Sequence, residues 1–155
     1  MKIAIGADHA GFLLKEKLRD ELRARGHDVL DAGTFGLDSV DYPDYAAAVA
    51  AEIVSGAVEK GILVCSSGVG MSIAANKING IRAALGVNND EVGFARKHND
   101  ANILAIGAKY TDEATAEGLV QVFLTMAFEG GRHARRIAKI QVLEDSQKGS
   151  VVHHE

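Results

Sequence analysis

The sequence predicts a doubly wound α/β fold: a Rossmann-like five-stranded parallel sheet with helices on both faces and a C-terminal helical extension. Short apolar runs of strand length alternate five times with segments of helical periodicity. Glycines and polar loops separate these segments from one another. Parallel strands need crossover connections, and helices on both faces of the sheet provide them.

The first strand, helix and second strand follow directly from the N-terminal residues. Residues 2–7 form a short apolar run, and residues 12–25 have the spacing of a helix. The helical spacing is carried by Leu14, Leu18 and Leu22. Gly26 is expected to end this helix, because glycine is favoured just after a helix C-terminus. Residues 27–31 then form the second short strand.

The alternation continues without a break to the C-terminal segment. Pro43 suits a helix start, and a helix is expected over residues 45–55. Residues 61–65 are an unbroken apolar run, which indicates a central strand covered on both faces. The next elements are helices over 71–77, 90–97 and 111–128 and strands over 81–87 and 103–106. A basic amphipathic segment, residues 132–145, forms the extension.

Length and composition predict one domain over residues 1–155, with a polar tail over residues 147–155 that is expected to fray. The net charge of −4 leaves no extended basic surface, so nucleic acid is not an expected partner. No run approaches the roughly 20 apolar residues of a membrane span, and the N-terminus lacks a signal-peptide pattern. We therefore expect a cytoplasmic protein without membrane contact.

Polar residues gather where the predicted strands end, which is where open α/β sheets bind ligands. Asp8 and His9 follow the first strand, and residues 65–70 follow the third. This loop leads into a helix, so its backbone N–H groups suit an anion. The dinucleotide fingerprint Gly-x-Gly-x-x-Gly is absent because position 73 is isoleucine. A nicotinamide cofactor is therefore not expected.

The residue types alone leave alternatives open at three places. Cys65, the single cysteine, is either a buried small hydrophobe or a working thiol, and its place before a helix favours the thiol. His98 either caps a helix end or takes part in acid–base chemistry. Arginines follow two glycines, either as a solvated helix face or as a phosphate clamp: Arg132, Arg135 and Arg136.

Several sequence blocks, in order, resemble the ribose-5-phosphate isomerase B family, which includes the galactose-6-phosphate isomerase subunits. The blocks are Gly6-Ala-Asp-His-Ala-Gly11, Asp41-Tyr-Pro43, Cys65-Ser-Ser-Gly-Val-Gly-Met-Ser-Ile-Ala-Ala-Asn-Lys77, Gly80-Ile-Arg-Ala83, His98-Asn-Asp100 and Glu129-Gly-Gly-Arg-His133. The resemblance implies an aldose–ketose isomerase that uses no metal and no cofactor. It also implies a homodimer or a dimer of dimers, with each active site at a subunit junction.

The resemblance assigns the chemistry of proton transfer to five positions. Cys65 corresponds to the base that moves a proton between C2 and C1 through a cis-enediolate. Ser67 corresponds to a hydroxyl that carries a proton between O1 and O2. His98, with Asp8, is expected to open the sugar ring. Asn99 corresponds to a donor to the negative oxygen of the intermediate. The loop amides are expected to act as further donors: Ser66, Ser67, Gly68, Val69 and Gly70.

The remaining positions are expected to bind the substrate. The phosphate is expected on His9, Arg132 and Arg136, and Tyr42 is expected to line the sugar channel. The chain departs from the family pattern at two of the binding positions. Ser66 stands where relatives often have glycine, and a positive φ there would cost about 1 kcal/mol. Lys109 stands where relatives often have an arginine. A lysine supplies a compact point charge, whereas an arginine supplies a planar guanidinium that can donate two parallel hydrogen bonds.

The resemblance favours ribose 5-phosphate and ribulose 5-phosphate as the substrate pair. The same chemistry on allose 6-phosphate, erythrose 4-phosphate or galactose 6-phosphate is an alternative. A different class of function, a non-catalytic nucleotide-binding module, fits the same fold. The C-terminal segment has an apolar stripe that is expected to pack on a partner subunit: Ile137, Ile140 and Leu143.

Overall fold

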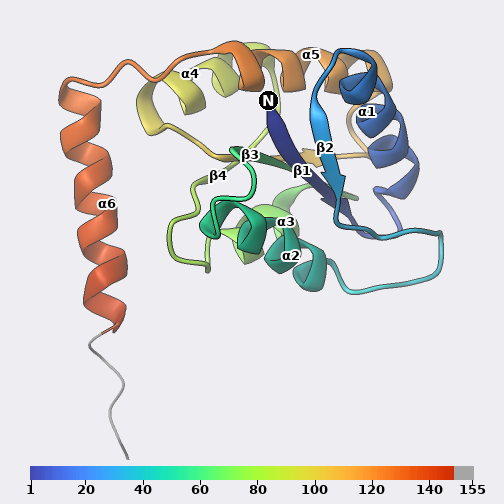
Figure 1. Ribbon diagram of the computed structural model, residues 1–155, viewed down its shortest axis with the longest axis horizontal. Coiled ribbons are helices and arrows are strands. Elements are labelled where there is room, and N and C mark those ends of the chain that lie inside the picture. Colours follow the sequence, from blue (N-terminus) through green and yellow to red (C-terminus); the bar gives the residue numbers. More distant parts are fainter. Residues whose placement is uncertain (149–155) are drawn as a thin grey trace, which may run out of the picture.

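A computed structural model describes residues 1–148 and contains one five-stranded sheet flanked by helices (Figure 1). The strands are β1 (Lys2–Ala7), β2 (Asp28–Asp31), β3 (Lys60–Cys65), β4 (Ala83–Leu85) and β5 (Ile103–Gly107). The helices are α1 (Phe12–Ala24), α2 (Tyr42–Val54), α3 (Val69–Ala75), α4 (Asn89–Asn99), α5 (Glu113–Thr125) and α6 (Arg132–Lys148).

The strands pair in the order β2-β1-β3-β5-β4, and every pairing is parallel. From β1 the chain adds β2 on one side and β3 on the other, so the direction of winding reverses between β1 and β3. In open α/β sheets such a reversal opens a crevice at the carboxyl ends of the two strands. The prediction of a doubly wound fold with helices on both faces is confirmed.

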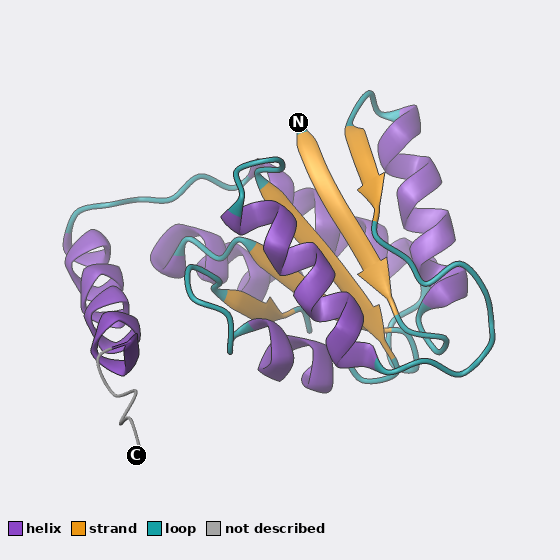
Figure 2. Cartoon of the chain, turned by 60° about the horizontal axis from the view of Figure 1, so that its bottom comes forward, coloured by secondary structure: helices purple, strands orange, loops and turns teal. Residues whose placement is uncertain are grey.

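Alternate residues of the central strand β3 pack into two separate cores. Ile62 and Val64 belong to a core with residues of α1, α4 and α5. Leu63 and Cys65 belong to a second core with residues of α2 and α3. Figure 2 shows these helices on the two faces of the sheet. Because all four side chains are at most 5% exposed, each aliphatic one contributes about 2 kcal/mol of hydrophobic stabilisation.

Helix and strand ends differ from the predicted bounds where side chains bond to the backbone. The α5 helix begins at Glu113 and not at 111, because the Asp112 side chain accepts the N–H of Thr115 at 2.8 Å. The fourth strand is shorter than predicted, and the Asn76 side chain bonds both backbone groups of its first residue, Ala83. The α2 helix begins three residues early, with Pro43 in its first turn.

A buried cation joins α1 to β2 and to the loop that follows β2. The Lys15 ammonium is fully buried and donates to Asp31 Oδ1 at 2.8 Å and to the carbonyl oxygen of Thr34 at 2.7 Å. Arg19 donates to the other oxygen of Asp31 at 2.8 Å. Burial would raise the pKa of Asp31, but the hydrogen bonds from Lys15, the Gly33 amide and Arg19 together lower it. Residue periodicity gave no sign of this network.

The C-terminal helix α6 stands apart from the sheet in both views (Figures 1 and 2). Its apolar residues Ile140, Val142 and Leu143 are exposed by 41%, 65% and 66%. The helix runs to Lys148, past the predicted end at 145 and into the segment predicted to fray, whose residues 149–155 lie outside the described part. None of the helices within residues 1–148 has the length and apolar character that a bilayer crossing requires.

Candidate active site

The adjacent carboxyl ends of β1 and β3 place Asp8 beside the end of β3 that carries Cys65. The Asp8 carboxylate is 7% exposed, and its Oδ1 accepts the N–H groups of Ala10 and Gly11, both at 3.0 Å. The backbone N–H of Asp8 donates to the carbonyl oxygen of Val64 at 3.3 Å, which holds the turn against β3. Asp8 therefore shapes the turn at the mouth of the crevice as well as placing a carboxylate there.

The neighbouring His9 is oriented by the loop that follows β2. Its Nδ1 accepts the backbone N–H of Val40 at 3.1 Å. An imidazole whose Nδ1 accepts a hydrogen bond carries its proton on Nε2 when neutral, so Nε2 is a donor. A donor at this position suits a phosphate oxygen, and the role of His9 in phosphate binding stays a prediction.

Cys65, at the carboxyl end of β3, is both a buried core residue and a hydrogen-bond acceptor. It is 5% exposed and packs with Leu63 and Met71 in the core under α2 and α3. Its Sγ is also an acceptor, since the backbone N–H of Gly68 donates to it at 3.1 Å. The sulfur therefore accepts a backbone hydrogen bond while the rest of its surroundings are apolar.

The loop between Cys65 and α3 is held tightly against β5. Gly68 has φ 79°, in the left-handed region, and a Cβ on it would lie 2.7 Å from Leu85 Cδ1. A Cβ on Gly107 would lie 2.5 Å from the carbonyl oxygen of Ser67. Among residues 1–148 the single non-glycine residue with positive φ is Asp100. Ser66 therefore does not have the positive φ, and the backbone strain, that the glycine in its relatives suggested.

Two of the loop amides predicted as oxyanion donors have acceptors within the loop. Gly68 donates to Cys65, and the N–H of Val69 donates to Ser67 Oγ at 3.2 Å. As arranged here, these two amides orient the sulfur and the hydroxyl. Gly70 lies against Tyr42, because a Cβ on this glycine would be 2.8 Å from the tyrosine ring. Tyr42 is thereby placed beside the loop, and its role in lining a substrate channel stays a prediction.

A cavity of about 400 Å³ opens on the β5 side of this loop. Ser67 is the one predicted catalytic residue that lines it, and Cys65 does not reach it. The other lining residues are Val69, Leu85, Gly86, Val87, Gly107, Tyr110 and Thr111. Lys109 is exposed beside the cavity, with Nζ 5.7 Å from the centre of the Tyr110 ring and its N–H donating to Ser66 O at 3.0 Å.

Most of these lining residues were missed by the sequence analysis, although a signal for them exists. They end or follow β4 and β5, whose carboxyl ends lie on the same edge of the sheet as Cys65. The site residues predicted at that edge of the sheet come mainly from the loops after the first and third strands. Asn88, which follows β4, caps α4 by accepting the N–H of Glu91 at 2.9 Å.

Four predicted site residues lie at the opposite edge of the sheet: His98, Asn99, Arg132 and Arg136. The α4 helix begins beside the carboxyl ends of the strands, so its last residues lie beside their amino ends. Consistent with this, the backbone carbonyl oxygen of Asn102, just after α4, accepts the N–H of Gly61 near the start of β3 at 2.9 Å. Gly61 and Cys65 are about 13 Å apart along an extended strand. The predicted pairing of His98 with Asp8 is therefore not formed within one chain.

The His98 ring is packed between two other rings. Its centre lies 4.9 Å from that of Phe94 and 4.1 Å from that of His133, on which it stacks with an angle of 9° between planes. Burial lowers the pKa of His133, and the nearby His98 and Arg132 lower it further. His133 is therefore neutral at neutral pH and provides a flat, uncharged support for the His98 ring.

Comparison with known proteins links this arrangement to one family. The family model for ribose and galactose isomerases matches residues 3–140. Ribose-5-phosphate isomerase B of Escherichia coli K12 is 43% identical over 143 residues, which covers 92% of this chain and 96% of that protein. A putative sugar phosphate isomerase of Bacillus subtilis is 43% identical over 146 residues, with coverage of 94% and 98%.

Solved structures agree with the sequence relatives. Ribose-5-phosphate isomerase B of Clostridium thermocellum superposes with a TM-score of 0.94 at 47% identity, covering 95% of this chain and 99% of that one. The Mycoplasma genitalium enzyme, solved with bound ribulose 5-phosphate, gives a TM-score of 0.90 at 38% identity, with coverage of 93% and 96%. With a matching family model, matching relatives and a shared fold, this chain belongs to the ribose/galactose isomerase family.

Proposed function

We propose that this protein interconverts ribose 5-phosphate and ribulose 5-phosphate, with Cys65 as the base. The observation that carries the proposal is the sulfur of Cys65 at the carboxyl end of β3, accepting the Gly68 N–H at 3.1 Å. The names of the relatives support the substrate pair, and one of the similar structures was solved with ribulose 5-phosphate bound.

The reaction needs one base that serves two adjacent carbons. The Cys65 thiolate takes the proton from C2 of the open-chain aldose, the C–H electron pair forms the C1–C2 double bond, and the carbonyl pair moves to O1. The Ser67 hydroxyl then carries a proton from O2 to O1. The Cys65 thiol returns its proton to C1 as the ketone forms at C2, which regenerates the thiolate. No electron acceptor or further reactant is needed.

We further propose that two copies of the chain complete each site. One copy supplies Asp8, His9 and Cys65 from its crevice, and the other supplies His98 and the arginines from its opposite edge. The support is the separation of these two groups within one chain, together with the exposed apolar residues of α6. In this arrangement His98 opens the ring near Asp8, while the arginines of α6 and His9 bind the phosphate.

Replacing Cys65 by alanine tests the proposed mechanism. Turnover of ribose 5-phosphate should fall by about 10³-fold, because a positioned acid–base group contributes about 10² to 10⁴ in rate. The matched control is Met71→Leu, a change of similar volume in the same core, which should keep nearly full turnover. Circular dichroism would verify that both variants fold. Wild-type turnover in Cys65→Ala would refute the role of the sulfur.

The substrate assignment is tested with a panel of four aldose phosphates in the presence of a chelator. The panel is ribose 5-phosphate, allose 6-phosphate, erythrose 4-phosphate and galactose 6-phosphate. We expect the highest kcat/KM with ribose 5-phosphate, by about tenfold or more, since one carbon in a pocket is worth about 1–3 kcal/mol. A higher kcat/KM with a hexose phosphate would leave the proposed isomerase chemistry standing and would overturn the assignment of ribose 5-phosphate as the substrate.

A further inference from the structure

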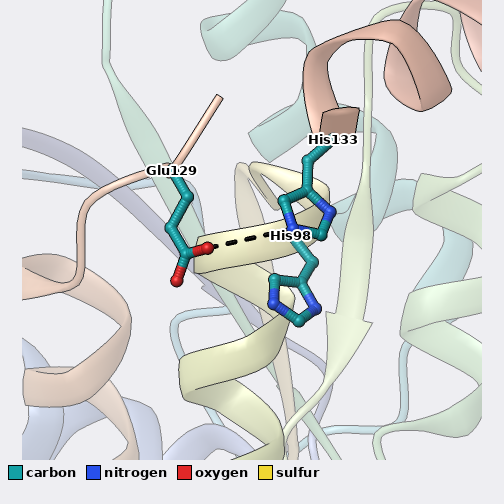
Figure 3. A group of neighbouring side chains, drawn as sticks. All are labelled: His98, Glu129 and His133. Atoms are coloured by element: carbon teal, nitrogen blue, oxygen red, sulfur yellow. Dashed lines mark ion pairs between the residues drawn. The ribbon is translucent and has the colours of Figure 1, made fainter. Parts of the chain in front are cut away.

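Three potential metal ligands meet where α4 approaches the start of α6. They are His98 on α4, Glu129 on the α5–α6 connection and His133 on α6 (Figure 3). Their ligand atoms all lie within 4.8 Å of one another. Within residues 1–148 this is the only such group of three or more histidine, cysteine or acidic side chains. We call these residues the His98–His133 cluster.

The backbone fixes the positions of these side chains. The N–H of Glu129 donates to the carbonyl oxygen of Lys97 at 3.0 Å, which ties the connection to the residue before His98. Gly130 and Gly131 have φ of 69° and 57°, so the chain turns back at once. The N–H of His133 donates to the carbonyl oxygen of Gly130 at 3.1 Å. The cluster is therefore arranged by the fold and not by long, free side chains alone.

One nitrogen of the cluster is buried without a partner. His133 is 5% exposed, and its Nε2 has no hydrogen-bond partner within the described part of the chain. The nearest carboxylate oxygen, Glu129 Oε2, lies 3.8 Å away, too far for a hydrogen bond. A buried polar atom left unbonded costs about 1–3 kcal/mol. A group placed between Nε2 and Oε2 would remove that cost.

A divalent cation suits the space between these side chains. The buried Nε2 of His133 has no hydrogen-bond partner in the described part of the chain and lies 3.8 Å from the Glu129 carboxylate, so a nitrogen and an oxygen ligand face the same position. The Glu129 carboxylate supplies the negative charge that a cation requires. The charges of Arg132 and Arg136 oppose a cation, but both side chains are exposed and hence screened by water and salt.

We infer that the His98–His133 cluster binds Zn²⁺, and that the bound ion inhibits the enzyme by engaging His98. Two imidazoles and one carboxylate are a donor set that Zn²⁺ takes with a fourth position left to water. Ligand bonds of about 2.0–2.2 Å require the 3.8 Å gap to close by a few tenths of an ångström and the stacked rings to turn toward the ion. The inhibitory part of the inference rests on the proposed function, whereas the binding part does not.

Metal titration of the full chain tests the binding. Zn²⁺ would be followed by calorimetry and Co²⁺ by its visible absorption, in a background carrying His153→Ala and His154→Ala to remove the two C-terminal imidazoles. We expect one ion per chain, and affinity at least tenfold weaker in Glu129→Gln and in His133→Phe, because loss of even an outer partner of a metal ligand costs about 10–100-fold. The phenylalanine keeps a ring against His98, and Glu129 is half exposed, so neither change removes the packing.

A second histidine provides a matched control. His27 also has a buried nitrogen without a partner, Nδ1, but belongs to no group of metal ligands among residues 1–148. His27→Gln should leave the metal affinity unchanged. Equal Zn²⁺ affinity in the wild type, Glu129→Gln and His133→Phe would overturn the inference. So would a thiolate-to-cobalt charge-transfer band, which would place the metal on Cys65.

Activity measurements test the consequence for catalysis. Zn²⁺ should inhibit isomerisation over the concentration range in which it binds, and Glu129→Gln should have normal basal turnover with at least tenfold weaker inhibition. Binding without inhibition would overturn the regulatory part. If the protein had no isomerase activity on any aldose phosphate, the proposed function would fail, and the cobalt titration would still decide whether the cluster is a metal site.

Discussion

At the scale of single residues, the environment of Cys65 is set by the backbone around it. The sulfur lies in an apolar core, yet the turn made possible by the left-handed conformation of Gly68 brings an N–H to 3.1 Å from it. The loop can form this turn only because Gly107 lets it approach β5 closely. A residue on a neighbouring strand thus controls the position of the proposed base.

Adding one methyl group at Gly107 should disturb the base without touching it. Gly107→Ala places a Cβ 2.5 Å from the carbonyl oxygen of Ser67, so the loop must move away from β5. We expect kcat/KM for ribose 5-phosphate to fall at least tenfold and stability to fall by about 1–3 kcal/mol. Gly36→Ala is the control, because a Cβ there meets no atom within 4 Å and should change stability by less than about 0.5 kcal/mol.

At the scale of elements, the charge network of Lys15 connects α1, β2 and the loop that orients His9. Asp31 accepts from both Lys15 and Arg19, and Lys15 also donates to the carbonyl oxygen of Thr34. The same loop later provides the Val40 N–H to His9. The network therefore fixes the start of the loop that orients His9, and it takes no part in the proposed chemistry.

Asp31→Asn should destabilise the fold by about 3 kcal/mol, because it removes the buried carboxylate of the fully buried Lys15 ammonium and leaves it only the more exposed Glu16 carboxylate, at 3.1 Å. The free energy of unfolding in urea, measured at pH 7, would show this loss. Lys17→Met is the control, since its ion pair with Glu113 is exposed on both sides and should contribute less than about 1 kcal/mol.

The contribution of Asp31 should also depend on pH. Its pKa is lowered in the folded protein from 3.8, so the folded state favours the carboxylate. The stabilisation is therefore complete above about pH 4 and is lost as the pH falls through the lower folded value. The difference in unfolding free energy between wild type and Asp31→Asn should shrink below pH 4. A difference that grew on acidification would contradict the assigned network.

Elements were predicted well because each carries a local signal, while the network and the distribution of the site depend on contacts between distant residues. The apolar run of 61–65 and the leucine spacing of 12–25 were enough for β3 and α1. Nothing near Lys15 in sequence indicates that its ammonium is buried against Asp31, 16 residues away. The edge on which His98 lies could have been predicted, because a helix that follows a parallel strand must end at the amino edge of the sheet.

At the scale of the whole molecule, the proposed sharing of sites makes a quantitative prediction for mixed subunits. Cys65→Ala and His98→Asn homodimers should each be nearly inactive. After exchange of subunits, half of the dimers would be mixed, and each mixed dimer would have one site with both residues intact. Isomerase activity should therefore recover to about a quarter of the wild-type value. No recovery, with exchange verified by mass spectrometry, would show that each site is complete within one chain.

Gly130 and Gly131 lie directly before α6, so a change in their backbone angles would change the direction of the whole helix. Seventeen residues at about 1.5 Å each give an arm of about 25 Å, so a swing of about 10° at Gly130 and Gly131 displaces Lys148 by about 4 Å. The same rotation moves the Cα of Arg132, next to the two glycines, by well under 1 Å. A small change of helix direction would therefore be felt mainly at the C-terminal end of α6, while the backbone at its cationic start would keep its position.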